Sequence, residues 1–282
     1  MTARIVLTVA ALTLHEAGRR RVVRSLAVLM VALLALSAWG FSLLDAEFGT
    51  FTSGESKMAA STVLNLVMFG LSLIAALGTA FLAGPTLAGE TESGIALAVL
   101  ARPVRRSAVL VGKWLGLVTF GSAFVILAGA AEFVVVRSTV GYWPPDPVAG
   151  LALLAAQTTA LLTLGLLLST VISPMASGIV SVGLFCATWI AGVVGGVGAI
   201  FDNESLARVG TVSQVMLPTD GLWRGAMYAF QDPSLLALAG SPAEGHPFLS
   251  QAPLTGAYLA WAGFWVVGVL TLAALSFQRR DL

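Results

Sequence analysis

Apolar residues gather along this chain into six long runs, each close to the length of a helix that crosses a bilayer. A hydrocarbon core of about 30 Å requires about 20 apolar residues in helical conformation. A single segment in lipid must also satisfy its own backbone hydrogen bonds, which a helix does. The pattern therefore predicts an all-α polytopic membrane protein with six transmembrane helices. The expected spans are Ser25–Leu44, Ser61–Gly84, Ala108–Val136, Ala149–Ile172, Ala176–Ile200 and Gly256–Phe277.

Composition agrees with this class. Of the 282 residues 57% are hydrophobic and 10% charged, whereas a soluble domain carries about a quarter charged residues. The mean hydropathy is +0.92. The net charge of +1 gives no reason to expect a nucleic-acid partner. The single cysteine, Cys186, excludes an intramolecular disulfide, and no residues stand at metal-ligand spacing, so we expect no metal.

Basic residues set the expected orientation, because cytoplasmic flanks carry an excess of lysine and arginine. Eleven of the 15 basic residues lie on one side of the predicted spans, which we therefore expect to be cytoplasmic together with both termini. They are Arg4, Arg19, Arg20, Arg21, Arg24, Arg102, Arg105, Arg106, Lys113, Arg279 and Arg280, against Lys57, Arg137, Arg208 and Arg224 on the other side. The first span has full transmembrane length and no A-x-A site before its polar end, so we expect it to be retained rather than cleaved.

Two local patterns refine the outline. Residues 1–22 carry Ile5, Val9 and Leu12 at helical spacing, which predicts an amphipathic helix in the inner membrane interface; a frayed polar tail is the alternative. Only residues 173–175 separate the fourth and fifth spans. Pro174 breaks the helix there, so these two spans are expected to form an antiparallel hairpin.

The segment 89–107, between the second and third spans, is the most polar interruption of the chain. Glu90 and Glu92 stand where a helix dipole favours negative charge, and Pro103 ends the segment. Arg105 and Arg106 follow, close to anionic head groups. The pattern is that of a short amphipathic helix parallel to the membrane, and a solvated loop fits the same residues.

A family resemblance favours the helix. Glu90-x-Glu92-x-Gly94, Leu100-x-x-Pro103-x-Arg105 and Gly112-Lys113, in this order, resemble the signature of ABC-2-type transporter permeases, as does the ending FQRRDL. The resemblance covers essentially the whole chain. It implies a cytoplasmic coupling helix that docks on an ATPase, and a location in the inner (plasma) membrane of a prokaryote. The implied ATPase-coupling residues are Glu90, Glu92, Gly94, Leu100, Pro103, Arg105 and Arg106.

If this chain moves a substrate uphill, the ATPase that supplies the energy must be a separate polypeptide. Around Gly112-Lys113, Ser107 and Trp114 replace the first glycine and the Ser or Thr of a Walker A motif. We therefore expect no cofactor in this chain, with ATP and magnesium held by a separate cytoplasmic ATPase dimer that moves the docked helix. Six spans are half of a typical twelve-span transporter, so a second permease copy or a paralogue is expected.

The segment 201–255 lies on the outer side. Trp223, Ala226, Met227 and Phe230 recur at helical spacing, which predicts an amphipathic helix with aromatic anchors at the outer interface. The stretch MLPTDGLWRG also resembles permeases associated with multicopper-enzyme maturation, including nitrous oxide reductase accessory transporters. The family resemblance implies an outer lid. Its residues are Pro218, Thr219, Asp220, Trp223 and Arg224.

Few polar groups lie within the spans. Glu132 comes late in the third span, so we expect it to reach the outer interface and to pair with Arg137, with a gating role as the alternative. Asn65 and Gln157 are expected to line a cavity or to bond between helices. Gly192 and Gly196 form a G-x-x-x-G pair, at a dimer seam, beside the pathway or in packing within one protomer.

The leading hypothesis is the permease subunit of an ATP-driven exporter, with lipid as its surroundings. A membrane-embedded enzyme is the first rival, but HEAGR from His15 lacks the second histidine of a zinc-protease motif, and no G-x-S-x-G elbow occurs. A passive channel or scaffold, which works without an ATPase, is the second. The apolar character of the spans favours an amphipathic or hydrophobic cargo.

Overall fold

The computed structural model describes residues 2–48, 54–86, 105–232, 247–250 and 252–279, and every regular element in these ranges is a helix. Six of the helices are long and apolar enough to cross a membrane. They are α2 (Arg21–Phe48), α3 (Gly54–Gly84), α6 (Arg106–Val140), α7 (Pro147–Ser169), α8 (Pro174–Ile200) and α12 (Gly256–Arg279). The predicted all-α polytopic class with six long apolar helices is confirmed.

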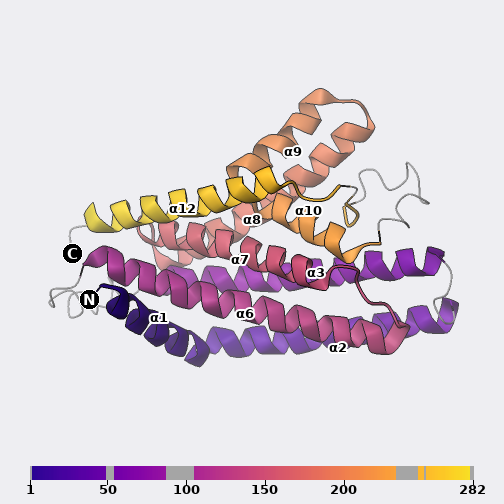
Figure 1. Cartoon of the computed structure of the whole chain (residues 1–282), viewed down its shortest axis with the longest axis horizontal. Coiled ribbons are helices and arrows are strands. Elements are labelled where there is room, and N and C mark those ends of the chain that lie inside the picture. The colour runs from indigo at the N-terminus through magenta and orange to yellow at the C-terminus, as the bar shows by residue number, and fades with distance from the viewer. Residues whose placement is uncertain (1, 49–53, 87–104, 233–246, 251, 280–282) are drawn as a thin grey trace.

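Three shorter helices complete the described part of the chain: α1 (Thr2–Arg19), α9 (Glu204–Met216) and α10 (Thr219–Phe230). In Figure 1, α2, α3 and α6 lie along the long axis of the molecule, and α8, α9 and α12 form the opposite side. α7 lies between these groups and contacts α3, α6, α8, α10 and α12. It is therefore the central helix of the bundle.

The largest core cluster joins α3 to α6. Leu64, Met68 and Leu71 recur every three or four residues, which places them on one face of α3, and each is at most 1% exposed. Phe133 of α6 packs in the same cluster. By contrast, side chains such as Phe264 of α12 are 75% exposed, as expected for a surface that faces lipid.

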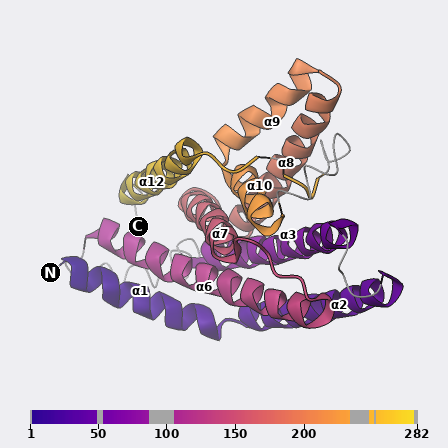
Figure 2. The same ribbon diagram turned by 45° about the vertical axis from the view of Figure 1, so that its right-hand side comes forward.

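The connection between α7 and α8 is a tight turn. Pro174 is the first residue of α8, a position where its missing N–H is not needed. α7 ends at Ser169, three residues before the expected end of that span. The Ser177 hydroxyl donates to the Gly165 carbonyl over 2.9 Å and fastens the two helices beside the turn. α8 then continues along α3 and α9, so that α8 and α9 stand out together in Figure 2.

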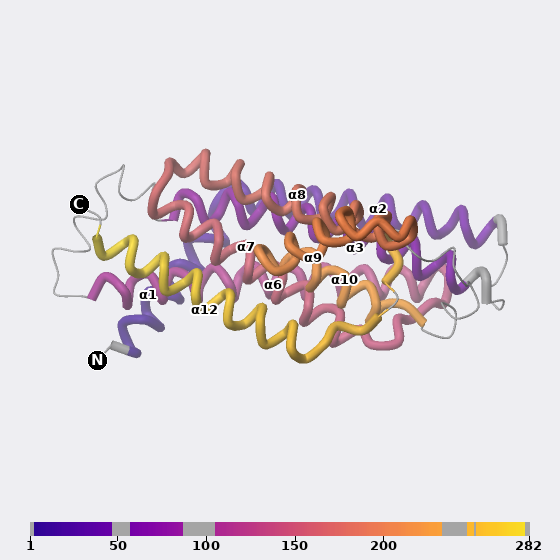
Figure 3. Tube along the Cα trace, turned by 90° about the horizontal axis from the view of Figure 1, so that it is seen from above, coloured from indigo at the N-terminus to yellow at the C-terminus, as the bar shows by residue number. Residues whose placement is uncertain are grey.

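Residues 2–19 form a helix, not a frayed tail, and α1 packs along the first turns of α6. Glycines of α6 allow this close approach. A Cβ at Gly112 would lie 2.7 Å from that of Val9, and one at Gly116 would lie 2.6 Å from the Ala10 carbonyl oxygen. Figure 3 shows the start of α1, the start of α6 and the end of α12 at one end of the molecule.

Candidate functional site

α9 and α10 form a helical hairpin that folds back into the bundle. α9 returns along α8 and packs closely against it, because a Cβ at Gly195 would lie only 2.7 Å from the Gly210 Cα. Small residues at a helix interface permit such backbone contact. The last turn of α9 therefore lies beside α8, with the side chains of Val215 and Met216 exposed.

α10 then runs along α7 toward the start of that helix. Its last residue, Phe230, packs against Gly150 near the start of α7, whereas the carbonyl of its first residue, Thr219, accepts from Gln157 Nε2 over 3.2 Å. Gln157 lies ten residues into α7, which is about 15 Å along the helix axis. The tip of the hairpin, at Leu217 and Pro218, is thus close to the middle of α7.

The carboxyl end of α9 is capped by side chains from α12. The last carbonyls of a helix have no partner within the helix, and an unsatisfied carbonyl in an apolar environment costs several kcal/mol. Three donors spaced at i, i+3 and i+7 on α12 supply the bonds. The pairs are Tyr258 Oη with Gln214 O (2.9 Å), Trp261 Nε1 with Val215 O (3.2 Å) and Trp265 Nε1 with Met216 O (2.8 Å).

Asp220 is the charged centre of this junction and is only 2% exposed. Its Oδ2 accepts from Gln214 Nε2 and from Arg224 Nε, each over 2.9 Å. Its Oδ1 has no partner among the residues that the structure describes. Both carboxylate oxygens lie over Gly192 of α8, where a Cβ would collide with them. This glycine therefore makes room for the carboxylate within the chain, and Gly196 lies half-buried one turn further along α8.

Uncharged polar groups extend the junction to α3 and α8. The hydroxyls of Thr219 and Thr188 lie 3.0 Å apart, and Gln157 Oε1 accepts from Ser72 Oγ over 3.2 Å. Nearer the start of α3, Asn65 Nδ2 donates to the Phe248 carbonyl over 2.9 Å. Gln157 thus bonds to α3 and α10, whereas Asn65 bonds to Phe248, which lies outside the helices.

Two expectations about α10 and α6 are wrong. Trp223 is not an anchor at the membrane surface, because it is 1% exposed and belongs to the main core cluster. Glu132 does not reach a surface or pair with Arg137. It is 1% exposed and accepts from Ser37 Oγ of α2, while Arg137 lies over the Trp143 ring, 5.3 Å from its centroid.

Tyr142, in the connection between α6 and α7, ties that connection to the hairpin. Its hydroxyl donates to the Phe230 carbonyl over 2.7 Å. Burial raises the pKa of this hydroxyl, the Asp232 carboxylate raises it further, and a hydrogen bond with Ser61 acts in the opposite direction. The phenol therefore keeps its proton and remains a donor to the end of α10.

The coupling residues Glu90, Glu92, Gly94, Leu100 and Pro103 lie outside the described residues. Arg105 is exposed just before α6, and Arg106 Nη1 donates to the Gln278 carbonyl over 3.4 Å. Buried Lys113 donates from Nζ to the Thr86 carbonyl over 2.7 Å. The two ends of the segment 87–104 are therefore tied together at the end of the bundle where α12 finishes.

The three aromatic donors of α12 form the part of the junction that sequence reasoning missed. Tyr258, Trp261 and Trp265 share one helix face. This is a detectable signal, because aromatic N–H and O–H groups in an apolar span need partners. Within the described ranges, no group of three His, Cys, Asp or Glu side chains is placed to hold a metal ion.

Comparison with known proteins identifies one family. The model for the ABC-2 family transporter protein matches residues 7–282. The comparison with individual curated proteins finds no match.

Proposed function

Because the chain belongs to the ABC-2 transporter family, we propose that it is the membrane-spanning permease subunit of an ATP-driven exporter. Permeases of this family are normally non-catalytic membrane subunits, and membership implies a partner ATPase on the cytoplasmic side. The observation that carries the proposal is the family match over 7–282, together with six long apolar helices.

The ATPase would engage the segment 89–107. In support, the described residues on either side of it are fixed to the bundle: Thr86 through Lys113, and Arg106 through Gln278. A force on this segment therefore acts directly on α3, α6 and α12. α1 is packed against the same part of α6 and offers a second contact for the ATPase.

The lid is the α9–α10 hairpin at the opposite half of the bundle. Within the hairpin, the buried Asp220 binds Gln214 of α9 and Arg224 of α10. Thr219 anchors the hairpin to the bundle, because its hydroxyl bonds to Thr188 of α8 and its carbonyl accepts from Gln157 of α7. Movement of α8 against α7 changes the contacts of Thr219. The hairpin thus opens or closes the outer end as the cytoplasmic end is driven.

The proposal also covers the orientation of the chain in the membrane and the number of permease subunits in the transporter. The basic residues favour a cytoplasmic location for both termini in a prokaryotic inner membrane. Two copies, or this chain and a paralogue, would form the complete transporter on an ATPase dimer. The match of Pro218, Thr219, Asp220 and Arg224 supports the subgroup associated with multicopper-enzyme maturation.

Purification of the chain from native membranes, followed by an ATP hydrolysis assay, tests the proposal. We expect an ATPase to co-purify, and we expect Gly94→Val and Pro103→Ala to reduce permease-stimulated hydrolysis. Gly245→Val and Pro242→Ala, the same substitutions in the segment 233–246, are matched controls and should leave hydrolysis intact. Transport by the chain alone, without an ATPase, would instead support a passive channel, and a chemical activity without nucleotide would support an enzyme.

A further inference from the structure

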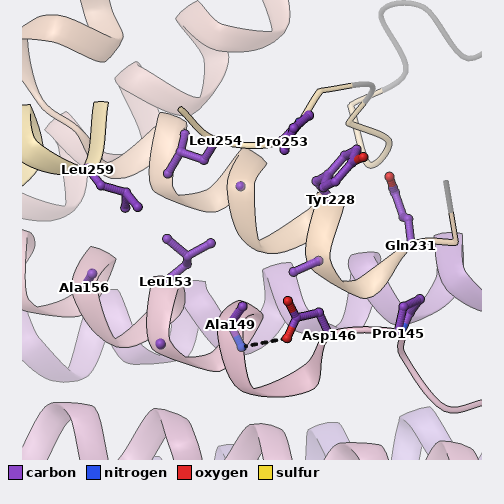
Figure 4. Close-up of a pocket in the computed structure, with 13 residues that line it drawn as sticks. Pro145, Asp146, Ala149, Leu153, Ala156, Tyr228, Gln231, Pro253, Leu254 and Leu259 are labelled. Carbon is purple, nitrogen blue, oxygen red and sulfur yellow. Dashed lines mark hydrogen bonds between the residues drawn. The ribbon is translucent and has the colours of Figure 1, made fainter. Parts of the chain in front are cut away.

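A pocket of about 560 Å³ lies between α7, α10 and the residues that lead into α12. Its size is within the range of sites that hold small ligands, about 300–1,000 Å³. Figure 4 shows Ala149, Leu153 and Ala156 along one wall, with Leu254 and Leu259 opposite them. α7 and α12 are both long and apolar enough to cross a membrane, and the wall from Ala149 to Ala156 belongs to the first half of α7.

Polarity changes along the pocket. Asp146, Tyr228 and Gln231 lie at the end where α7 begins, whereas the other end is lined by Ala156 and Leu259. Asp146 and Ala156 are ten residues apart on α7, which corresponds to about 15 Å along the axis. The pocket therefore has a polar mouth and an apolar interior, the same arrangement as a lipid whose head group lies at the interface.

The groups at the mouth define the charge of the ligand. Both polar ends of the Gln231 amide are used, because Nε2 donates to Phe248 O and Oε1 accepts from Ser250 N. Among the described residues, the exposed Asp146 carboxylate accepts only a long bond, 3.4 Å, from the backbone N–H of Ala149. No described residue that lines the pocket is basic. The mouth thus attracts an ammonium group and disfavours a head group whose net charge is negative.

The lining favours a flexible apolar chain as the occupant. Three alanines of α7, Ala149, Ala152 and Ala156, line one wall, and Leu254 and Leu259 lie opposite them. An acyl chain is thin and adaptable, so it can follow this wall along its length.

We propose that this pocket binds one acyl chain of a phospholipid with an ethanolamine head group. The ammonium lies beside Asp146 and the Tyr228 hydroxyl, and the chain runs along α7 toward Ala156 and Leu259. The occupant comes from the bilayer leaflet that the mouth faces. It fills the gap between α10 and α12 and so supports the hairpin on the side that α8 does not cover.

Photo-crosslinking in nanodiscs tests the site. The full chain is reconstituted with phosphatidylethanolamine that carries a diazirine in one acyl chain, and the labelled peptides are identified by mass spectrometry. We expect labelling to concentrate on residues 149–156 and 253–259. Ala152→Phe, which fills the pocket, should abolish that labelling, whereas Ala260→Phe, on an exposed position of α12 outside the pocket, should not.

Head-group selectivity gives a second readout. The phosphatidylglycerol analogue should label the pocket about two- to fivefold less, the range expected for one partly exposed ion pair. Asp146→Asn retains a good N-cap for α7 and should remove this difference. Equal labelling by the two lipids in the unmodified chain, labelling unaffected by Ala152→Phe, or crosslinks to a second copy or to residues 233–246 in place of lipid would overturn the proposal.

Discussion

Asp220 and Gly192 show how single residues fix the hairpin. A carboxylate buried within a membrane bundle is costly, and it is retained where partners hold it. Here Gln214 and Arg224 bind Oδ2, and the absence of a side chain at Gly192 leaves space for both oxygens. The glycine on α8 and the carboxylate on α10 therefore form one structural unit.

Gly192→Ala tests that unit. The added methyl group must displace the Asp220 carboxylate, and overpacking of this kind costs about 1–3 kcal/mol. We expect a lower melting temperature in detergent for this variant. The matched control is Gly183→Ala on the same helix, where a Cβ meets nothing within 4 Å. That control should keep the melting temperature or raise it, and equal losses in both variants would contradict the assigned contact.

The sequence indicated which polar residues lie within the bundle, but it did not indicate their hydrogen-bond partners. Asn65 and Gln157 were expected to line a cavity or to bond between helices; Gln157 bonds to α3 and α10, and Asn65 bonds to Phe248, which lies outside the helices. The pairing of Glu132 with Arg137 was wrong because residues five apart point about 140° away from each other around a helix. The partner of Glu132, Ser37, is 95 residues away in the chain, and no local pattern indicates such a contact.

The carboxyl end of α9 depends on a neighbouring helix. Its last carbonyls have no partner within α9, so they need donors from elsewhere. One face of α12 supplies three of them. This contact also holds the first half of α12 close to the hairpin.

Trp265→Phe removes one of these donors and keeps the ring. Interhelical hydrogen bonds in membranes contribute about 0.6 kcal/mol, and up to about 1.7. We expect faster hydrogen–deuterium exchange of the backbone amides in α9, with little change in α7. Phe264→Leu, at an adjacent exposed position of α12, is the control. Exchange in α9 that is unchanged in Trp265→Phe would show that the bond does not stabilise the helix end.

The sequence predicted that α10 is a helix but not where it lies. Periodicity reports which residues share a face, and Trp223, Met227 and Phe230 do share one. An apolar face of this kind fits a membrane surface and a protein core equally well. The polar groups of Thr219 and Asp220 explain why α10 lies within the bundle. They form hydrogen bonds with residues of α7, α8 and α9.

The two ends of the molecule are held together by different contacts. One end joins α1, α3, α6 and α12 through Gly112, Gly116, Lys113 and Arg106. The other half contains the hairpin and its polar junction. The six apolar runs were enough to predict the six long helices. The arrangement of these helices around α7 depends on contacts between residues far apart in the sequence, and the length of an apolar run carries no information about such contacts.

Lys113→Met tests the connection at the first end. It removes the bond from Nζ to the Thr86 carbonyl, and a hydrogen bond to a charged group contributes about 1.5–3 kcal/mol. We expect the ATPase to remain bound while permease-stimulated ATP hydrolysis and transport fall. Lys57→Met, the same change on the exposed start of α3, should preserve both. If ATP hydrolysis and transport persisted in Lys113→Met, the bond between Lys113 and Thr86 would not be needed for coupling to the ATPase.

The most direct measurement concerns the segment 89–107 itself. In a Cys186→Ser background, a cysteine introduced at Ala98 provides the chain with one thiol for crosslinking. We predict a crosslink to the ATPase in inside-out membrane vesicles, with a yield that changes when ATP is added, and no labelling by an impermeant thiol reagent applied to intact cells. Labelling from outside, or an assembled complex in which this cysteine never crosslinks to the ATPase, would contradict the proposal that an ATPase drives this permease through that segment.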